Sequence, residues 1–218
     1  MRLDIRGTII QDDEQWIYDW FGEPATSPGV VLRAIDKAKG EDLDIYLSSP
    51  GGDVFAGSEI YSALRTYKGA VRIHVTGMAC SAASVIMCSG WCEIAPTAQV
   101  MVHNASMWSG GDYHDMDKAS EILQKVNESV AAAYVEKTGM SLEDALALMD
   151  RETWMTAADA LELGLVDAIE QSEQQKDEKP LRFAAASGGL LPRSVIEKMQ
   201  AERIQIITDL RELKGKEV

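Results

Sequence analysis

The stretch that first suggests chemistry is a run of small residues, TGMACSAAS, at positions 76–84. It holds three candidate nucleophiles: Cys80, Ser81 and Ser84. A serine attacks a carbonyl only when a base lies within hydrogen-bond reach and donors face the developing oxyanion. A helix that begins at the serine offers free backbone amides, and small neighbours let a substrate approach. The same residues would also suit tight helix packing, so the segment alone does not single out a nucleophile.

A second candidate feature is the stretch SSPGGDVFAG at positions 48–57, where a predicted strand ends in Pro-Gly-Gly before a helix. Exposed amides at such a turn can stabilise an anion, although a plain tight turn explains the sequence equally well. The Gly-x-x-x-x-Gly-Lys of a phosphate loop is missing here. The Gly-x-Ser-x-Gly of the α/β-hydrolase elbow is likewise missing from positions 76–84.

Three histidines are candidates for the base. His74 lies inside the apolar segment VRIHV, which favours a structural role, and His114 lies in a polar stretch, which favours a solvated side chain. His103 ends the predicted strand QVMVH. A histidine at a strand tip is fixed on one side and open on the other, as a general base must be. Taken alone, His103 could still be structural.

The elements that must position these residues alternate between strands and helices, which predicts an α/β fold with βαβ-type crossovers. Strands are expected at 3–10, 42–49, 70–75, 92–95, 99–103 and 165–169. Helices are expected at 27–40, 50–69 after a tight turn, 79–90, 115–139, 141–149 and 156–164. Ser27 is a predicted N-cap with Pro28 in the first turn, and Ser141 begins a Ser-x-x-Asp capping pattern.

Charge divides the chain near residue 170. Residues 1–170 carry 12 Lys and Arg against 27 Asp and Glu, whereas residues 171–218 carry 9 against 8. The polar stretch after residue 170 contains Gly, Ser and Pro, as linkers do. The prediction is therefore a domain at 1–170, a linker at 171–192 and a charged amphipathic helix at 193–218.

Composition excludes several classes of function. The net charge of −14 argues against nucleic-acid binding, and no apolar run approaches the length of a membrane span. The first residues lack the apolar core of a secretory signal, so a cytoplasmic location is expected. Cys80, Cys88 and Cys92 are expected to be buried thiols, because no further Cys or His pair completes a metal site around them.

Four stretches, taken in order, resemble the Clp protease proteolytic-subunit family: LSSPGGDVFAGSEIYSAL, VTGMACSAASVIMCSG, PTAQVMVHNAS and TGMSLEDALALMDRETWMTAADALELGLVDAI. The resemblance covers roughly residues 2–170. It implies a ClpP/crotonase-type spiral of ββα units and a serine endopeptidase that needs no metal and no cofactor.

Carried over residue by residue, the resemblance makes Ser81 the nucleophile and His103 the base. The oxyanion donors become the backbone amides of Gly52 and Ala82. The third member of the triad is usually an aspartate, and an ungapped comparison places Glu152 there. Asp150, two residues earlier, is the alternative acid.

The resemblance also implies a homo-oligomer of stacked rings, with the long helix expected at 115–139 as the handle between rings. The loop at 104–115 would bind a protein or peptide substrate as an added strand. The opening LDIRGTI, the ETWMTA segment and the long tail look most like phage and prophage head-maturation proteases, which cut scaffold and capsid proteins. The tail stretch at 184–189 would then suit self-processing.

Two alternatives stay open. One is a degradative Clp subunit coupled to an unfoldase ATPase. The other is a crotonase-fold acyl-CoA enzyme or a catalytically silent assembly protein.

Overall fold

The computed structural model describes residues 1–171, which belong to a compact unit of the chain, Met1–Ser172. The predicted linker and C-terminal helix, from residue 172 onward, lie outside the described residues. The strands are β1 (Arg2–Ile9), β2 (Ala25–Thr26), β3 (Leu43–Gly52), β4 (Val71–Cys80), β5 (Trp91–Ile94), β6 (Gln99–Val102), β7 (Thr153–Thr156) and β8 (Ala168–Ile169). The helices are the 3₁₀ turn η1 (Asp12–Glu14), α1 (Gln15–Phe21), α2 (Pro28–Ala38), α3 (Val54–Arg65), α4 (Ala82–Met87), α5 (Tyr113–Thr138), α6 (Leu142–Asp150) and α7 (Ala157–Glu162).

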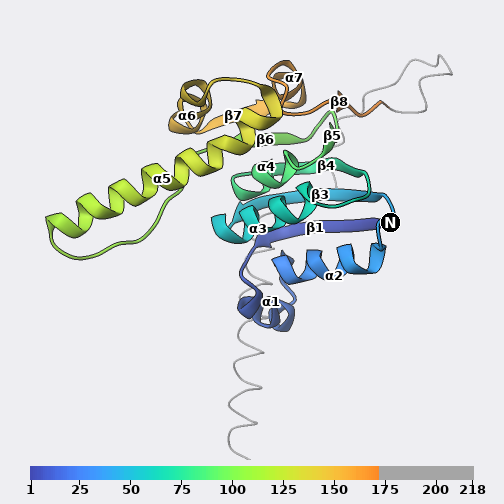
Figure 1. The fold of residues 1–218 in the computed structure, drawn as a ribbon, viewed down its shortest axis with the longest axis horizontal. Coiled ribbons are helices and arrows are strands. Elements are labelled where there is room, and N and C mark those ends of the chain that lie inside the picture. Colours follow the sequence, from blue (N-terminus) through green and yellow to red (C-terminus); the bar gives the residue numbers. More distant parts are fainter. Residues whose placement is uncertain (172–218) are drawn as a thin grey trace, which may run out of the picture. The chain divides into compact units, whose positions relative to one another are not determined.

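The expected α/β fold is confirmed, and its centre is a mostly parallel sheet in the order β2-β1-β3-β4-β5-β8 (Figure 1). β6 pairs in parallel with the carboxyl end of β4, at residues 78–80, and β7 pairs antiparallel with β6. Parallel neighbours require crossovers, and α2, α3 and α4 supply them between successive strands. The buried side chains of these helices and strands form one continuous apolar core.

Alternation of buried and more exposed residues, most regular in β3, gives the sheet one apolar and one polar face. In β3, Leu43, Ile45 and Leu47 are fully buried, whereas the residues between them are partly exposed. Each fully buried leucine or isoleucine stabilises the fold by about 1.5–3 kcal/mol. This core holds the carboxyl ends of β3 and β4 rigidly, and the candidate residues lie at those ends.

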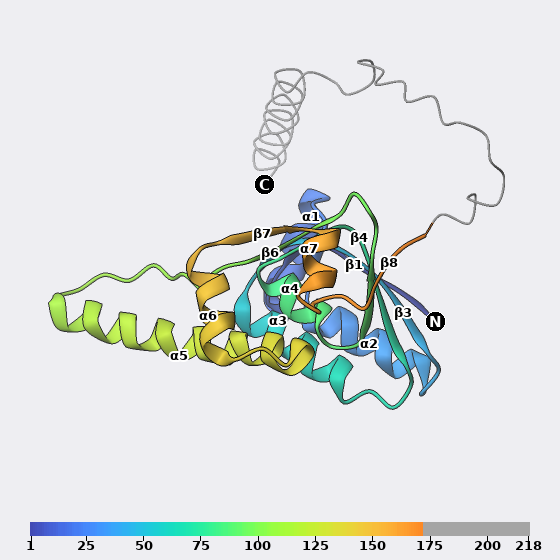
Figure 2. The ribbon, with the colours of Figure 1, turned by 90° about the horizontal axis from the view of Figure 1, so that it is seen from above.

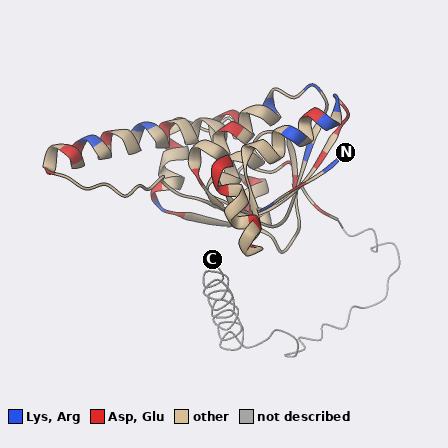
Figure 3. Ribbon diagram, turned by 90° about the horizontal axis from the view of Figure 1, so that it is seen from below, with Lys and Arg blue, Asp and Glu red and all other residues tan. Residues whose placement is uncertain are grey.

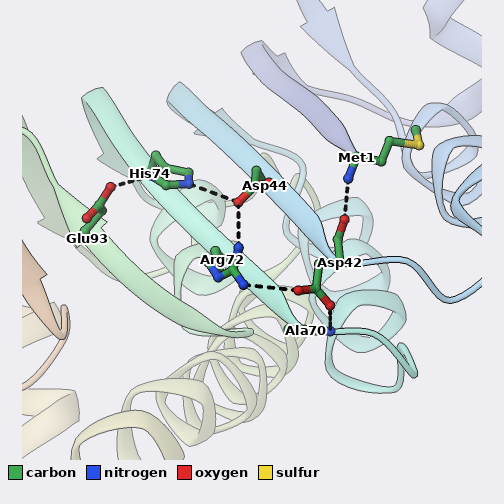
Figure 4. Close-up of polar contacts among 7 residues, drawn as sticks. All are labelled: Met1, Asp42, Asp44, Ala70, Arg72, His74 and Glu93. Atoms are coloured by element: carbon green, nitrogen blue, oxygen red, sulfur yellow. Dashed lines mark hydrogen bonds and ion pairs between the residues drawn. The ribbon is translucent and has the colours of Figure 1, made fainter.

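The polar face of the sheet carries a ladder of charged side chains across neighbouring strands (Figure 4). Arg72 lies 3.1 Å from Asp42 and 3.4 Å from Asp44. The ring of His74 lies between two carboxylates, with Nδ1 2.6 Å from Glu93 and Nε2 3.6 Å from Asp44. His74 therefore takes part in the cross-strand ladder, as the structural interpretation of this histidine predicted.

The longest helix, α5, projects from the rest of the unit together with the loop that precedes it (Figure 2). Its start is fixed by a capping box between Asp112 and Asp115, and its end by Gly139 at φ 76°. Asp and Glu are interspersed with Lys along it (Figure 3). Neither α5 nor any other helix within residues 1–171 is both long and apolar enough to cross a membrane.

Several elements differ from the sequence-based expectation. β2 was not expected, and β3 continues through residues 50–52, where a tight turn was predicted. β4 continues to Cys80, so the next helix starts at Ala82 and not near residue 79. α1 was missed because its seven residues are too few for helical periodicity to be recognised. β7 was missed because four residues are too few for alternation to be recognised.

Candidate active site

Ser81 lies at the junction between β4 and α4, where it is the N-cap residue of the helix. Its backbone has φ 55° and ψ −125°, a conformation that a residue with a side chain adopts at a cost of about 1–3 kcal/mol. The Ser81 amide donates a hydrogen bond of 2.9 Å to the carbonyl of Met101. This hydrogen bond to β6 helps to keep Ser81 in its strained backbone conformation. Backbone strain of this kind is typical of functional residues.

His103 follows β6 directly, and its Nε2 atom lies 2.8 Å from the Ser81 hydroxyl oxygen. Parallel pairing of Cys80 with Met101 brings the two strand ends together. The structure therefore brings together the two residues that the sequence suggested as nucleophile and base. A pair at this distance meets the geometric requirement for proton transfer from serine to imidazole.

The Pro-Gly-Gly turn lies against the nucleophile through Gly51. A Cβ atom on Gly51 would fall 2.7 Å from Ser81 Cβ and 3.0 Å from the Ala82 amide nitrogen. Gly51 also has φ 93°, so glycine is required there on both steric and conformational grounds. A Cβ on Gly52, at φ 146°, would instead overlap the carbonyl oxygen of Ile9 in β1.

The buried hydroxyl of Ser49 fixes this turn and was missed from the sequence. It donates to the carbonyl of Gly7 at 2.6 Å and accepts from the Gly51 amide at 3.1 Å. Ser49 is fully buried, and these two hydrogen bonds satisfy its hydroxyl group, as buried polar groups require. The double serine before Pro50 was visible in the sequence, but nothing local distinguished Ser49 from Ser48.

The two candidate acids have different partners. Asp150 accepts a 2.7 Å hydrogen bond from the Asn104 side chain, and Glu152 lies 3.4 Å from the indole nitrogen of Trp154. Within residues 1–171, the His103 ring hydrogen-bonds only to Ser81, so neither carboxylate is in direct contact with it. Glu152 has φ 48°, the left-handed conformation.

The register of β6 and β7 nevertheless relates one of these acids to the base. Their antiparallel pairing matches Val102 with Thr153. The ladder ends at this pair, so His103 directly follows one of its members and Glu152 directly precedes the other. Asp150 is three residues from Thr153 and ends α6, so it lies outside this ladder.

The other candidate nucleophiles are buried and otherwise engaged. Ser84 is fully buried and hydrogen-bonds to the Ser81 carbonyl at 2.6 Å and to the Tyr134 hydroxyl at 2.8 Å. Cys80 is buried, and the loss of solvation raises the pKa of its thiol, which keeps it protonated. Of the three candidate nucleophiles in positions 76–84, Ser81 is the one whose side chain hydrogen-bonds to a histidine.

The remaining cysteines are buried as expected. Loss of solvation raises the pKa of Cys88 to about 12 and that of Cys92 further still. No group of three or more metal-ligating side chains occurs in the described part of the chain.

A cavity of about 690 Å³ opens at Ser81 and His103, between α3 and α5. Its apolar lining includes Val54, Phe55 and Val126. Polar and charged side chains from α5, such as Lys118, Glu121 and Lys125, also contribute to it. A space of this size next to the serine suits a side chain and flanking backbone of a bound peptide.

Comparison with known proteins agrees with this geometry. The family model described as Clp protease matches residues 29–173. An "ATP-dependent Clp protease proteolytic subunit" of Bacteroides fragilis is 33% identical over 143 residues, which are 64% of this chain and 68% of the relative. The subunit of the same name from Porphyromonas gingivalis is 34% identical over 142 residues, 63% of this chain and 64% of the relative.

A longer match is with "ATP-dependent Clp protease proteolytic subunit 3" of Rhodococcus jostii. It is 31% identical over 175 residues, 78% of this chain and 84% of the relative. The segment matched by the family model contains Ser81 and His103, which line one cavity, and residues 50–52. The chain therefore belongs to the Clp protease family.

Proposed function

We propose that this chain is a serine endopeptidase that cleaves peptide bonds through Ser81 and His103. The observation that carries the proposal is the 2.8 Å contact between Ser81 Oγ and His103 Nε2 at the mouth of a cavity. Membership of a peptidase family supports it. In the first step Ser81 Oγ bonds to the substrate carbonyl carbon while its proton passes to His103 Nε2.

The oxyanion formed in this step needs donors beside the serine. Ala82 N–H is the first amide of α4, and among the described residues no backbone carbonyl accepts a hydrogen bond from it. Gly52 N–H, from the turn whose Gly51 contacts Ser81, is the proposed second donor. Donors of this kind act by stabilising charge that develops only in the transition state.

The second half of the reaction uses the same groups. When the tetrahedral intermediate collapses, the C–N bond breaks and His103 gives its proton to the departing amine. Water then attacks the acyl-enzyme, with His103 again taking the proton, and Ser81 is regenerated. We propose Glu152 as the acid that orients His103; its place directly before Thr153, the partner of Val102 in the β6–β7 ladder, supports this choice, and Asp150 is the alternative.

The proposed substrate is an extended peptide. The apolar part of the cavity, with Val54, Phe55 and Ile122, would take one side chain, and the loop at 104–112 would supply backbone pairing. We propose a homo-oligomer of stacked rings in which α5 forms the contact between rings. Its projection from the unit supports that assignment (Figure 2).

Two settings for this activity make different predictions. Head maturation in a phage or prophage, with scaffold or capsid protein as substrate, follows from the sequence resemblance alone. Coupling to an ATPase has separate support in the name of the relatives, "ATP-dependent Clp protease proteolytic subunit". Mass spectrometry of the purified chain distinguishes them, because self-processing near residues 184–189 is expected only of the maturation protease. Stable binding to a hexameric unfoldase is expected only of the ATPase-coupled subunit.

A fluorophosphonate probe tests the activity itself. The probe should label the wild-type chain at Ser81, and the Ser81→Ala variant should not react. Ser120→Ala is the matched control, because Ser120 is an exposed serine on α5 outside the cavity. An unlabelled wild-type chain in every assembly state would instead favour a catalytically silent member of the fold.

A further inference from the structure

A buried chain of hydrogen bonds links α5 to the backbone of the nucleophile. Tyr134 of α5 is 2% exposed and Ser84 of α4 is 0% exposed. The Tyr134 hydroxyl lies 2.8 Å from Ser84 Oγ, and Ser84 Oγ lies 2.6 Å from the carbonyl oxygen of Ser81. Neither hydroxyl makes or breaks a bond in the proposed hydrolysis by Ser81 and His103.

The direction of this chain follows from the protons available. A carbonyl oxygen can only accept, so Ser84 must donate its one hydroxyl proton to Ser81. Ser84 Oγ then has no proton left for Tyr134, so Tyr134 must donate to it. Burial raises the pKa of Tyr134, while the hydrogen bond with Ser84 opposes that shift; the phenol therefore stays protonated and able to donate.

The carbonyl that receives the chain belongs to the peptide bond between Ser81 and Ala82. The N–H at the other end of that same peptide is the proposed oxyanion donor. The O–C–N–H unit is conjugated, so a hydrogen bond at the oxygen draws electron density toward it and makes the N–H a stronger donor. It also fixes the plane of the peptide, and with it the direction in which the Ala82 N–H points.

We propose that Tyr134 and Ser84 are positioning residues that orient and polarise the Ser81–Ala82 peptide for oxyanion stabilisation. The inference rests on the proposed function, because it assigns these hydroxyls a role in the reaction at Ser81. It also makes α5 part of the reaction centre, since a displacement of Tyr134 by about one ångström would take the hydroxyl pair beyond hydrogen-bond distance.

The test measures phosphonylation of Ser81, which needs no knowledge of the natural substrate. In this reaction Ser81 Oγ bonds to phosphorus, the P–F bond breaks, fluoride leaves and the serine proton passes to His103. Tyr134→Phe should lower the limiting rate of labelling by roughly three- to tenfold, the scale of one hydrogen bond. The apparent affinity for the probe should stay unchanged, because the oxyanion contact strengthens only in the transition state.

Variants of the pair keep the test interpretable if Tyr134→Phe folds poorly. The double variant Ser84→Ala/Tyr134→Phe removes both polar partners, so it leaves no buried hydroxyl unsatisfied. It should be as stable as the wild type within a few degrees of Tm and as slow as Ser84→Ala alone, because the two residues act through one chain. Its pH–rate profile should keep its shape, because the imidazole is untouched.

The matched control is Tyr67→Phe, outside the cavity, where the hydroxyl donates to the Glu41 carbonyl at 2.7 Å and accepts from the Gly40 amide at 3.0 Å. It should label at the wild-type rate. If wild type labels at Ser81 and the folded double variant labels equally fast, the positioning role is wrong and the proposed activity stands. If wild type does not label at all, both fail.

Discussion

His103 Nε2 lies 2.8 Å from Ser81 Oγ although 22 positions separate the two residues in the chain. The contact exists because β4 and β6 run in parallel and end together, with Cys80 beside Met101. Replacing His103 with alanine removes the base but leaves the cavity walls in place. The rate of peptide hydrolysis should fall by roughly 10³- to 10⁴-fold with little change in KM. Steady-state kinetics measures both quantities, and a raised KM at unchanged kcat would contradict the assignment.

The acid is tested by a pair of isosteric changes. Glu152→Gln should lower kcat by about 10²- to 10⁴-fold, because an uncharged side chain no longer balances the imidazolium. Asp150→Asn, at the residue that accepts from Asn104, should keep activity within about threefold. The two variants are compared by kcat at matched thermal stability. The reverse ranking would assign the role to Asp150.

Gly51→Ala probes the close approach of the turn to the nucleophile. The new Cβ would lie 2.5 Å from the Cys80 carbonyl oxygen, so either the turn or the Ser81 backbone must move. We expect activity to be lost and the free energy of unfolding to fall by about 2 kcal/mol or more.

Gly40→Ala is the matched control for this change. Gly40 has φ 92°, almost the same as Gly51 at φ 93°, but an added Cβ there meets nothing within 4 Å. This variant should lose about 1 kcal/mol of stability through backbone strain alone and keep full activity. Equal activity in the two variants would show that the turn is not part of the site.

Because burial raises the pKa values of two thiols, we expect the folded chain to become less stable at alkaline pH. The pKa values of Cys88 and Cys92 are raised by burial, so the folded chain keeps protons that the unfolded chain releases above the ordinary thiol value of about 8.5. Stability is therefore complete below that pH and falls as pH rises, by up to about 1.4 kcal/mol per pH unit for each thiol. Urea unfolding between pH 8 and 11 measures the slope.

The control for the alkaline slope is a Cys88→Ala/Cys92→Ala double variant, which should lower the slope. The raised pKa of Tyr134 adds a contribution of the same sign at higher pH, so some slope should remain in the variant. An unchanged slope in the double variant would show that the thiols do not carry the effect.

The sequence was sufficient to predict the α/β class and the Ser81–His103 pair. Strand alternation and apolar helix faces identify long, half-buried elements, and His103 ends one such strand. These local features made Ser81 and His103 candidates, and the resemblance to the Clp protease family was needed to single them out. Helix caps can also be predicted from the local sequence. The predicted N-cap Ser141 accepts a hydrogen bond of 3.0 Å from the Asp144 amide.

Features that depend on several distant segments were not predictable. The role of Ser49 in fixing residues 50–52 can be recognised only from its hydrogen bond to Gly7, which lies 42 positions away in the chain. The contact of Tyr134 with Ser84 was not predictable, because Ser84 lies 50 positions earlier in the chain. The pairing of β6 with β7, which brings the segment of the proposed acid beside that of the base, was also not predictable, because the four residues of β7 carry too little pattern to be recognised.

The residues of the proposed reaction centre lie on two pairs of strands. His103 directly follows β6 and Glu152 directly precedes β7, whereas Ser81 directly follows β4 and Gly51 lies near the end of β3. A shift of the β6–β7 strand pair would therefore move the proposed base and the proposed acid together relative to Ser81. Such a shift would also lengthen the contact between His103 and Ser81, on which the proposed proton transfer depends.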